Sequence, residues 1–110
     1  MATVNLVELR KAIRDGKAKA AEYVAANPEG PNWFPCGFAN LHTKCRKNAR
    51  EAAVLRDEGF RWDDYLKSYA HGAYNWTNTQ SMDYKESILR SFQSALSDAG
   101  IPSSVQTRID

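Results

Sequence analysis

Four cations crowd a short segment near the middle of the chain. Lys44, Arg46, Lys47 and Arg50 lie around the predicted start of a helix over residues 46–58. The helix macrodipole disfavours positive charge at this end, so stability alone would place acids there. Free backbone N–H groups combined with cations form a binding site for an anion, in particular a phosphate. A solvated basic patch is the alternative interpretation of the same residues.

Aromatic residues flank this basic segment on both sides and could supply the base-stacking half of a nucleotide pocket. A base that stacks on an exposed ring can gain about 1–3 kcal/mol. Rings also dominate the packing of small cores, so burial is the competing interpretation. The best candidates surround a predicted hairpin turn at His71-Gly72. The predicted stacking and turn residues are Tyr69, His71, Gly72, Tyr74 and Trp76.

The cysteines and histidines number four, as a zinc site requires: Cys36, His42, Cys45 and His71. Their spacing matches no standard zinc pattern. On a straight strand Cys36 and His42 would stand about 20 Å apart, which argues against a shared metal and against a nucleophile–base pair of these two residues, whereas His71 could approach Cys36 across the sheet. We therefore predict free thiols, no metal and no cofactor. A buried, inert Cys36 is favoured over a catalytic one.

Asp63-Asp64 is the remaining candidate for acid–base chemistry. Adjacent residues of a strand point to opposite faces, so the two carboxylates would not share a substrate. A turn explains the pair better. No general acid–base pair is assembled, so a non-enzymatic protein is favoured over an enzyme, and a small enzyme that uses Cys36 is the last alternative.

The composition predicts one soluble domain over residues 1–110. Hydrophobic content of 43% and charged content of 25% are ordinary for a globular protein. Fifteen Lys and Arg against thirteen Asp and Glu give a net charge of +2, too small to indicate nucleic-acid binding by itself. No signal peptide and no membrane-spanning run is present, so we expect a cytoplasmic protein without membrane contact.

The first predicted element is a helix over residues 5–26, which begins at a capping-box-like Asn5. Apolar side chains at helical spacing form a buried stripe: Leu6, Leu9, Ile13, Ala20 and Val24. Arg10, Arg14 and Lys17 form a row that we expect on a solvated face. A turn-rich linker over residues 27–35 follows the helix.

The remaining chain, residues 36–110, is predicted to mix strands and helices. A strand over residues 36–42 would place small residues, Gly37 and Ala39, on a face that another backbone can approach. Thr43 is a possible N-cap of the helix over residues 46–58, and Gly59 its stop. Residues 60–77 are expected to be mostly strand.

The last predicted helix is the clearest. Ser81 caps it, a wide apolar face follows, and Gly100 with Ile101 ends it. The apolar face comprises Ile88, Leu89, Phe92, Ala95, Leu96 and Ala99. A final strand alternates over Val105, Thr107 and Ile109. The elements predict an α+β fold, with three helices packed on a small, mainly antiparallel sheet of three or four strands.

Four ordered pieces of sequence carry a resemblance: Cys36-Gly37-Phe38-Ala39; Ser68-Tyr69 with Gly72 and Trp76; Gln80-Ser81; and Ala99-Gly100-Ile101 with Arg108-Ile109-Asp110. In this combination the chain resembles a family of small, uncharacterised tailed-phage and prophage proteins. It departs from the family pattern at Asn40, where an aromatic residue is usual. It also departs at His71, because this chain reads Tyr69-Ala70-His71-Gly72 where the family usually has Tyr-Tyr-Gly-Gly. The resemblance implies a phage origin and, by analogy, interference with host defence or host machinery.

Together these observations predict a non-enzymatic phage accessory protein in the host cytoplasm. It would sequester an anionic ligand of nucleotide type, with the four cations on the phosphate and Tyr69, Tyr74 or Trp76 on the base. One alternative is an inhibitor that docks an exposed aromatic patch on a host protein. Another is nucleic-acid binding along the basic rows of the first two helices. A site formed across a homo-oligomer interface is also compatible with the sequence.

Overall fold

The structure is a computed structural model that describes residues 5–28, 36–79 and 81–109. Within these ranges the chain forms three helices and four strands, in the order α1 (Leu6–Ala26), β1 (Gly37–Thr43), α2 (Arg50–Asp57), β2 (Arg61–Asp63), β3 (Ser68–Gly72), α3 (Met82–Asp98) and β4 (Ser104–Ile109). The strands pair antiparallel in the order β2-β3-β1-β4. The predicted α+β fold is confirmed.

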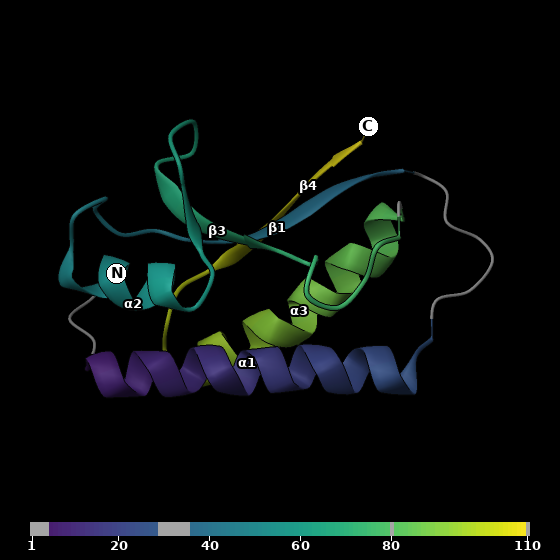
Figure 1. Ribbon diagram of the computed structural model, residues 1–110, viewed down its shortest axis with the longest axis horizontal. Coiled ribbons are helices and arrows are strands. Elements are labelled where there is room, and N and C mark those ends of the chain that lie inside the picture. The colour runs from purple at the N-terminus through teal and green to yellow at the C-terminus, as the bar shows by residue number, and fades with distance from the viewer. Residues whose placement is uncertain (1–4, 29–35, 80, 110) are drawn as a thin grey trace.

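The elements form layers, which Figure 1 shows from the side. Helix α3 packs on β1 and β4, and α1 packs on α3 and α2. Alternation along β1 buries Gly37, Ala39 and Leu41 toward α3, as predicted. Phe38 and Asn40 point the other way, onto a sheet face that no helix of the described residues covers. We call this second face the outer face.

The predicted helix start at Asn5 is confirmed. The Asn5 side-chain oxygen accepts hydrogen bonds from the backbone N–H of Val7 at 2.8 Å and of Glu8 at 3.3 Å. The predicted stripe faces inward, with Leu9, Ile13 and Ala20 buried against the core. The predicted linker over residues 27–35 lies mostly outside the described residues.

The basic row of α1 is only partly solvated, because Arg14 is exposed whereas Arg10 and Lys17 are half-buried, and all three pair with one acid. Arg10 Nη1 lies 2.9 Å from a carboxylate oxygen of Glu58, and Arg14 Nε and Lys17 Nζ each lie 3.6 Å from the other oxygen. Glu58 follows α2 directly and is only 8% exposed. The row therefore connects α1 to the end of α2. Its three cations contact the Glu58 carboxylate, whereas the nucleic-acid alternative would have them contact phosphates.

Helix α2 begins four residues later than predicted. Its N-cap is Ala49, which makes no side-chain capping hydrogen bond. Thr43, the predicted cap, is instead the last residue of β1, where it pairs with Tyr69 and donates from Oγ1 to the Pro102 carbonyl at 3.0 Å. Because the strand extends to Thr43, residues 44–49 form the connection. The stop at Gly59 is confirmed by its φ of 96°.

The hairpin turn predicted at His71-Gly72 is wrong. Both residues belong to β3, where they pair with Leu41 and Asn40 of β1. The turn occupies residues 64–67 instead, between β2 and β3. Asp63 Oδ1 accepts from the backbone N–H of Tyr65 at 2.9 Å and of Leu66 at 3.0 Å. A carboxylate stabilises this turn in place of glycine, so no glycine marks it in the sequence.

The last helix matches its prediction closely. Ser81 Oγ accepts from Tyr84 N–H at 3.3 Å, and Ile101 N–H returns to the Leu96 carbonyl at 2.9 Å. Ile101 is buried, as expected for a residue folded back on the last turn. Ala99 differs from expectation, because it is the exposed C-cap rather than part of the apolar face. None of the described helices is long and apolar enough to cross a bilayer.

Candidate functional site

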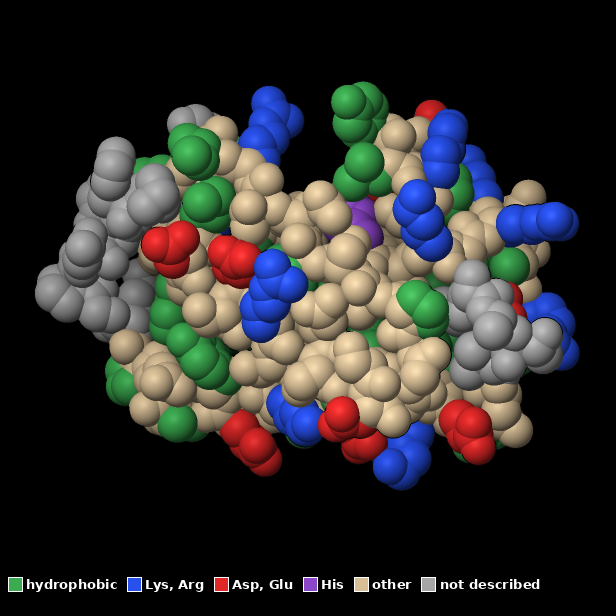
Figure 2. Space-filling model, turned by 180° about the vertical axis from the view of Figure 1, so that it is seen from behind, with side chains coloured by type: hydrophobic (Ala, Val, Ile, Leu, Met, Phe, Trp, Pro, Cys, Tyr) green, Lys and Arg blue, Asp and Glu red, His purple; other side chains and the backbone are tan. Residues whose placement is uncertain are grey.

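The four predicted phosphate ligands lie at one end of the molecule. Lys44, Arg46 and Lys47 belong to the β1–α2 connection, and Arg50 is the first residue of α2. All four side chains are exposed. Figure 2 shows Lys and Arg side chains gathered at the end that holds α2 and the β2–β3 hairpin. We call the connection over residues 44–49 the basic loop.

The backbone of the basic loop is held from beneath. The Tyr69 hydroxyl donates to the Lys47 carbonyl and accepts from Arg56 Nη1 at 3.0 Å. Cys45 packs against the core, and its burial, with Glu51 nearby, raises the pKa of its thiol. The loop is thus fixed by its inward-facing groups while its charges point to solvent.

The charges of the basic loop and of Arg50 are not paired with acids in the described part of the chain. Among the described residues, Lys44, Arg46, Lys47 and Arg50 form no ion pair with an acidic side chain. Residues 44–56 contain five Lys or Arg and one acid, whereas the whole chain has a net charge of +2. This end of the molecule therefore attracts anions more strongly than the overall charge suggests.

The predicted stacking residues divide into buried and exposed ones. Tyr69 and His71 are each 1% exposed, so neither ring offers a face to a ligand in this conformation. Trp76 is half-buried and packs against the core. Tyr74 is 59% exposed and stacks on His71, with ring centroids 5.3 Å apart and an interplanar angle of 6°. One face of the Tyr74 ring is therefore covered by the buried His71 ring.

His71 lies in an aromatic enclosure. The rings of Phe60, Trp76 and Phe92 surround it at 5.2 to 5.6 Å, beside the stacked Tyr74. Its Nδ1 lies 2.6 Å from the Gly72 carbonyl, which can only accept, so Nδ1 carries the proton. Nε2 is buried without a partner among the described residues. Burial lowers the pKa of His71, the hydrogen bond to Gly72 partly offsets this effect and Lys17 adds to it, so the neutral ring predominates at pH 7.

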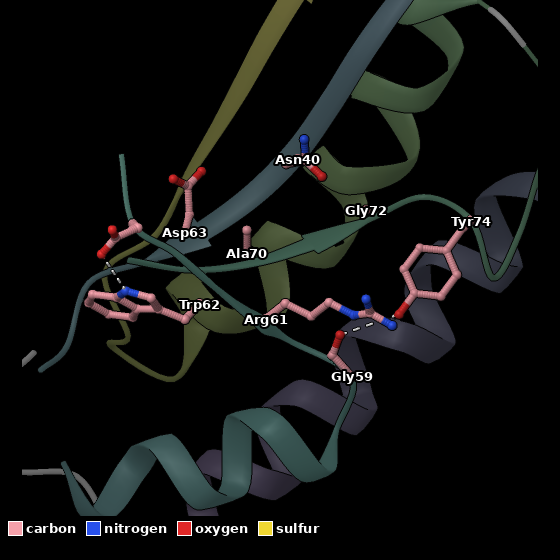
Figure 3. A pocket seen from close by; sticks show the side chains of 9 residues that line it. Asn40, Gly59, Arg61, Trp62, Asp63, Ala70, Gly72 and Tyr74 are labelled. Carbon is pink, nitrogen blue, oxygen red and sulfur yellow. Dashed lines mark hydrogen bonds between the residues drawn. The ribbon is translucent and has the colours of Figure 1, made fainter. Parts of the chain in front are cut away.

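An open pocket of about 640 Å³ lies on the outer face beside Tyr74. We call it the outer pocket, and Figure 3 shows its side chains. Tyr74 closes one side, where its hydroxyl donates to the Gly59 carbonyl at 3.3 Å. The Arg61 side chain runs along the pocket from β2. The pocket is lined by Asn40, Gly59, Arg61, Trp62, Asp63, Asp64, Ala70, Gly72 and Tyr74.

The pocket carries both charge signs, but its acids have partners. Asp63 accepts two backbone N–H groups of the turn, as described above. Asp64 accepts from Lys67 Nζ at 3.0 Å and Trp62 Nε1 at 3.2 Å, and these bonds lower the pKa of its carboxyl. Lys47 adds a smaller effect on this pKa in the same direction. Arg61 is exposed and pairs with no acid among the described residues.

A second opening of about 540 Å³ adjoins the outer pocket on the same face, and the two share Asn40 and Asp63. His42 lies in its wall, with Nδ1 2.8 Å from Ser68 Oγ. Burial lowers the pKa of His42, and Asp63 partly offsets this effect. Ser68 is fully buried, which leaves its hydroxyl no access to a substrate as a nucleophile.

The cysteines and histidines are spread over separate places. Cys36 precedes β1, and His42 lies near the end of that strand. His71 lies on β3, where its ring packs among the aromatic rings of the core. Both cysteines are free thiols. No group of three or more His, Cys, Asp or Glu within residues 5–28, 36–79 and 81–109 is arranged to hold a metal ion.

Two polar residues that the fold brings to the pocket, Asn40 and Arg61, are not among the predicted ligand-binding residues. In the sequence Asn40 stands out as a departure from the family pattern, and Arg61 lies between Phe60 and Trp62 in a segment predicted to be mostly strand. Their common signal is alternation, because both are polar residues on strands whose neighbours are buried or half-buried. Comparison of the chain with protein-family models, curated proteins and solved structures finds no match.

Proposed function

We propose that the protein binds a phosphate-bearing ligand of nucleotide type in the outer pocket and does not transform it. The observation that carries the proposal is the pairing, in one pocket, of an exposed aromatic ring with an arginine that has no acidic partner among the described residues. A volume of about 640 Å³ is within the usual range for a small-molecule site.

Each part of the pocket matches a part of a nucleotide. Tyr74 offers one free ring face, and its stacking on His71 removes the entropy cost of ordering it on binding. Arg61 has the planar donor fork that suits phosphate oxygens. Asn40 and Asp63 supply acceptors for the N–H and O–H groups of a base or sugar.

The basic loop extends the site beyond the pocket. The Tyr69 hydroxyl of β3 holds the Lys47 carbonyl, and Lys44, Arg46 and Arg50 lie on the same connection or at the start of α2. A ligand with more than one phosphate could contact Arg61 and the basic loop together. We therefore expect cyclic dinucleotides or nucleoside polyphosphates to bind more tightly than nucleoside monophosphates.

Calorimetric titration with ATP, AMP and cyclic di-AMP tests this function. We expect Tyr74→Ala and Arg61→Ala each to weaken binding of the tightest ligand at least tenfold. Arg46→Glu should weaken the binding of ATP more than the binding of AMP. It should leave the thermal unfolding temperature unchanged, because Arg46 is exposed and forms no ion pair with a described acid. Arg90→Ala, on the exposed side of α3, is the matched control and should bind like wild type.

Absence of binding by all three nucleotides would overturn the proposal. Equal affinities for wild type, Tyr74→Ala and Arg61→Ala would move the ligand to another surface. Affinity that falls steeply with salt for any single-stranded DNA would favour the nucleic-acid alternative instead. The biological setting we propose, sequestration of a nucleotide signal of host defence by a phage protein, is supported only by the resemblance.

A second candidate function is docking on a host protein. It is favoured by two large exposed hydrophobic side chains beside the pockets of the outer face, Phe38 at 51% and Tyr65 at 91% exposure. Aromatic side chains of this kind are common anchors of protein interfaces. A double Phe38→Ser and Tyr65→Ser variant should then lose capture of a host protein while keeping nucleotide affinity.

A further inference from the structure

Strand β4 forms one edge of the sheet. On one side it pairs with β1 over six residues, from Gly37 opposite Ile109 to His42 opposite Ser104. Its other side pairs with no strand among the described residues. In a strand, alternate residues direct N–H and C=O groups to the two sides. Half of the β4 backbone groups therefore point outward, as a template for a further strand.

This edge lacks the features that usually prevent pairing with another chain. Residues 104–109 contain no proline and a single charge, Arg108, and Ile109 is 68% exposed. The opposite edge is different, because β2 has only three residues and leads into a turn that carries Asp64 and Lys67. Short, charged edges resist strand addition, whereas longer and weakly charged ones permit it.

We propose that β4 pairs antiparallel with β4 of a second copy of this chain, about a two-fold axis through Thr107. Such an axis stands perpendicular to the sheet, so residues on the same face lie opposite each other. With Thr107 opposite itself, Val105 faces Ile109 of the second copy. Gln106 then faces Arg108 of the second copy, and the symmetry repeats both contacts.

The pairs formed in this register are chemically matched on both faces. On the α3 face, the half-buried Val105 covers the exposed Ile109. On the outer face, Gln106 offers an amide oxygen to the Arg108 guanidinium. Thr107 meets Thr107, and such cross-strand threonine pairs are favourable. Centring the axis on Gln106 instead would place Val105 opposite Thr107, which leaves Ile109 without an apolar partner.

The proposed interface is small, because it involves mainly one strand of each copy. We therefore expect a reversible dimer whose population depends on protein concentration. It lies at the opposite edge of the sheet from β2, and no residue of β4 lines the outer pocket, so it does not rest on the proposed nucleotide site. It would join the two sheets into one continuous eight-stranded sheet.

Sedimentation equilibrium of the full chain over a wide concentration range tests the dimer, and residue 106 tests its register. Wild type should pass from 12.4 kDa to twice that mass as concentration rises. Gln106→Lys places a lysine opposite Arg108 at two positions and should raise the dissociation constant at least tenfold. Gln106→Glu places a carboxylate there and should lower the constant several-fold. Both substitutions are at the same exposed position, so a loss of folding would affect them alike.

Cysteine cross-linking provides a second, positive test. Thr107→Cys brings two thiols together at the axis, and diamide should convert it to a covalent dimer. Ser104→Cys, at the far end of the strand, and wild type with its two native thiols serve as controls and should cross-link much less. A wild type that remains at 12.4 kDa throughout, or equal responses of Gln106→Lys and Gln106→Glu, would overturn the proposal.

Discussion

Gly16 of α1 and Phe92 of α3 lie so close that a β-carbon on residue 16 would stand 2.5 Å from Phe92 Cδ1 and 2.9 Å from the Phe92 carbonyl oxygen. The glycine is therefore a contact point between the two helices. Phe92 in turn packs edge-on against Phe60 and Trp76. The absence of a side chain at residue 16 thus leaves the space in which the Phe92 ring packs between the two helices and the core.

Gly16→Ala should destabilise the protein, although alanine is the better helix former. Helix propensity alone would favour the substitution by about 1 kcal/mol. The contact with a backbone oxygen cannot be relieved by a side-chain rotation, so we expect a net loss of about 1–3 kcal/mol. Chemical denaturation measures the change. Ala18→Gly, an exposed α1 position, is the reference for propensity without packing, and a stabilised Gly16→Ala would contradict the contact.

Glu58→Gln should weaken the attachment of α2 to α1. The neutral amide leaves Arg10, Arg14 and Lys17 close together without their shared carboxylate. Breaking a fully buried ion pair costs roughly 3–5 kcal/mol, but these cations are partly exposed and screened, so we expect about 1–2 kcal/mol. Urea unfolding at low and high salt measures this loss in the free energy of unfolding. Glu22→Gln, an exposed position, should change stability by less than about 0.5 kcal/mol.

The elements that the sequence predicts well are those whose ends are set by local chemistry. Asn5 and Ser81 each cap a helix with their own side chains, and Gly100 adopts the left-handed φ of 75° that ends α3. Such signals require only neighbouring residues. The sheet face of β1 follows from alternation in the same way.

The parts that the sequence predicts poorly depend on tertiary contacts. The start of α2 is displaced because Thr43 remains paired with Tyr69 of β3. The turn at residues 64–67 uses the Asp63 carboxylate instead of glycine. Tyr69 and His71 are polar enough to suggest a ligand site, but both are buried in the core. The Tyr69 hydroxyl is satisfied by the Lys47 carbonyl, and the His71 ring packs inside an aromatic enclosure. None of these partners is close in sequence.

His71 should make the protein less stable in mild acid. Its pKa is lowered by burial in the folded state, while the unfolded state keeps a value near 6.5. Below this pH the unfolded chain binds more protons than the folded one, so the free energy of unfolding decreases as pH falls from about 6.5 toward the folded pKa. Lys17 is the charged group that opposes protonation of the ring.

The contribution of His71 can be separated from that of His42, whose pKa is also lowered by burial. His71→Phe keeps an aromatic ring in the enclosure but removes the titrating group and its hydrogen bond to the Gly72 carbonyl. The lost bond lowers stability at every pH, whereas the decrease in unfolding free energy between pH 7.5 and pH 5 should be smaller than in wild type. The difference between wild type and variant isolates His71, because His42 titrates in both proteins. Parallel pH profiles for the two would show that His71 does not titrate in this window.

Tyr69→Phe should loosen the basic loop with a limited loss of stability. The ring stays in the core, but the Lys47 carbonyl loses its donor and Arg56 loses its acceptor. We expect a loss of about 1–3 kcal/mol, and faster amide exchange in residues 44–49 than in β1. Tyr65→Phe makes the same chemical change on a ring that is 91% exposed, and it should leave both quantities unaltered. Because Tyr69 holds the basic loop that the proposed polyphosphate ligand would contact, Tyr69→Phe should also weaken ATP binding more than AMP binding, whereas equal weakening would place the phosphates on Arg61 alone.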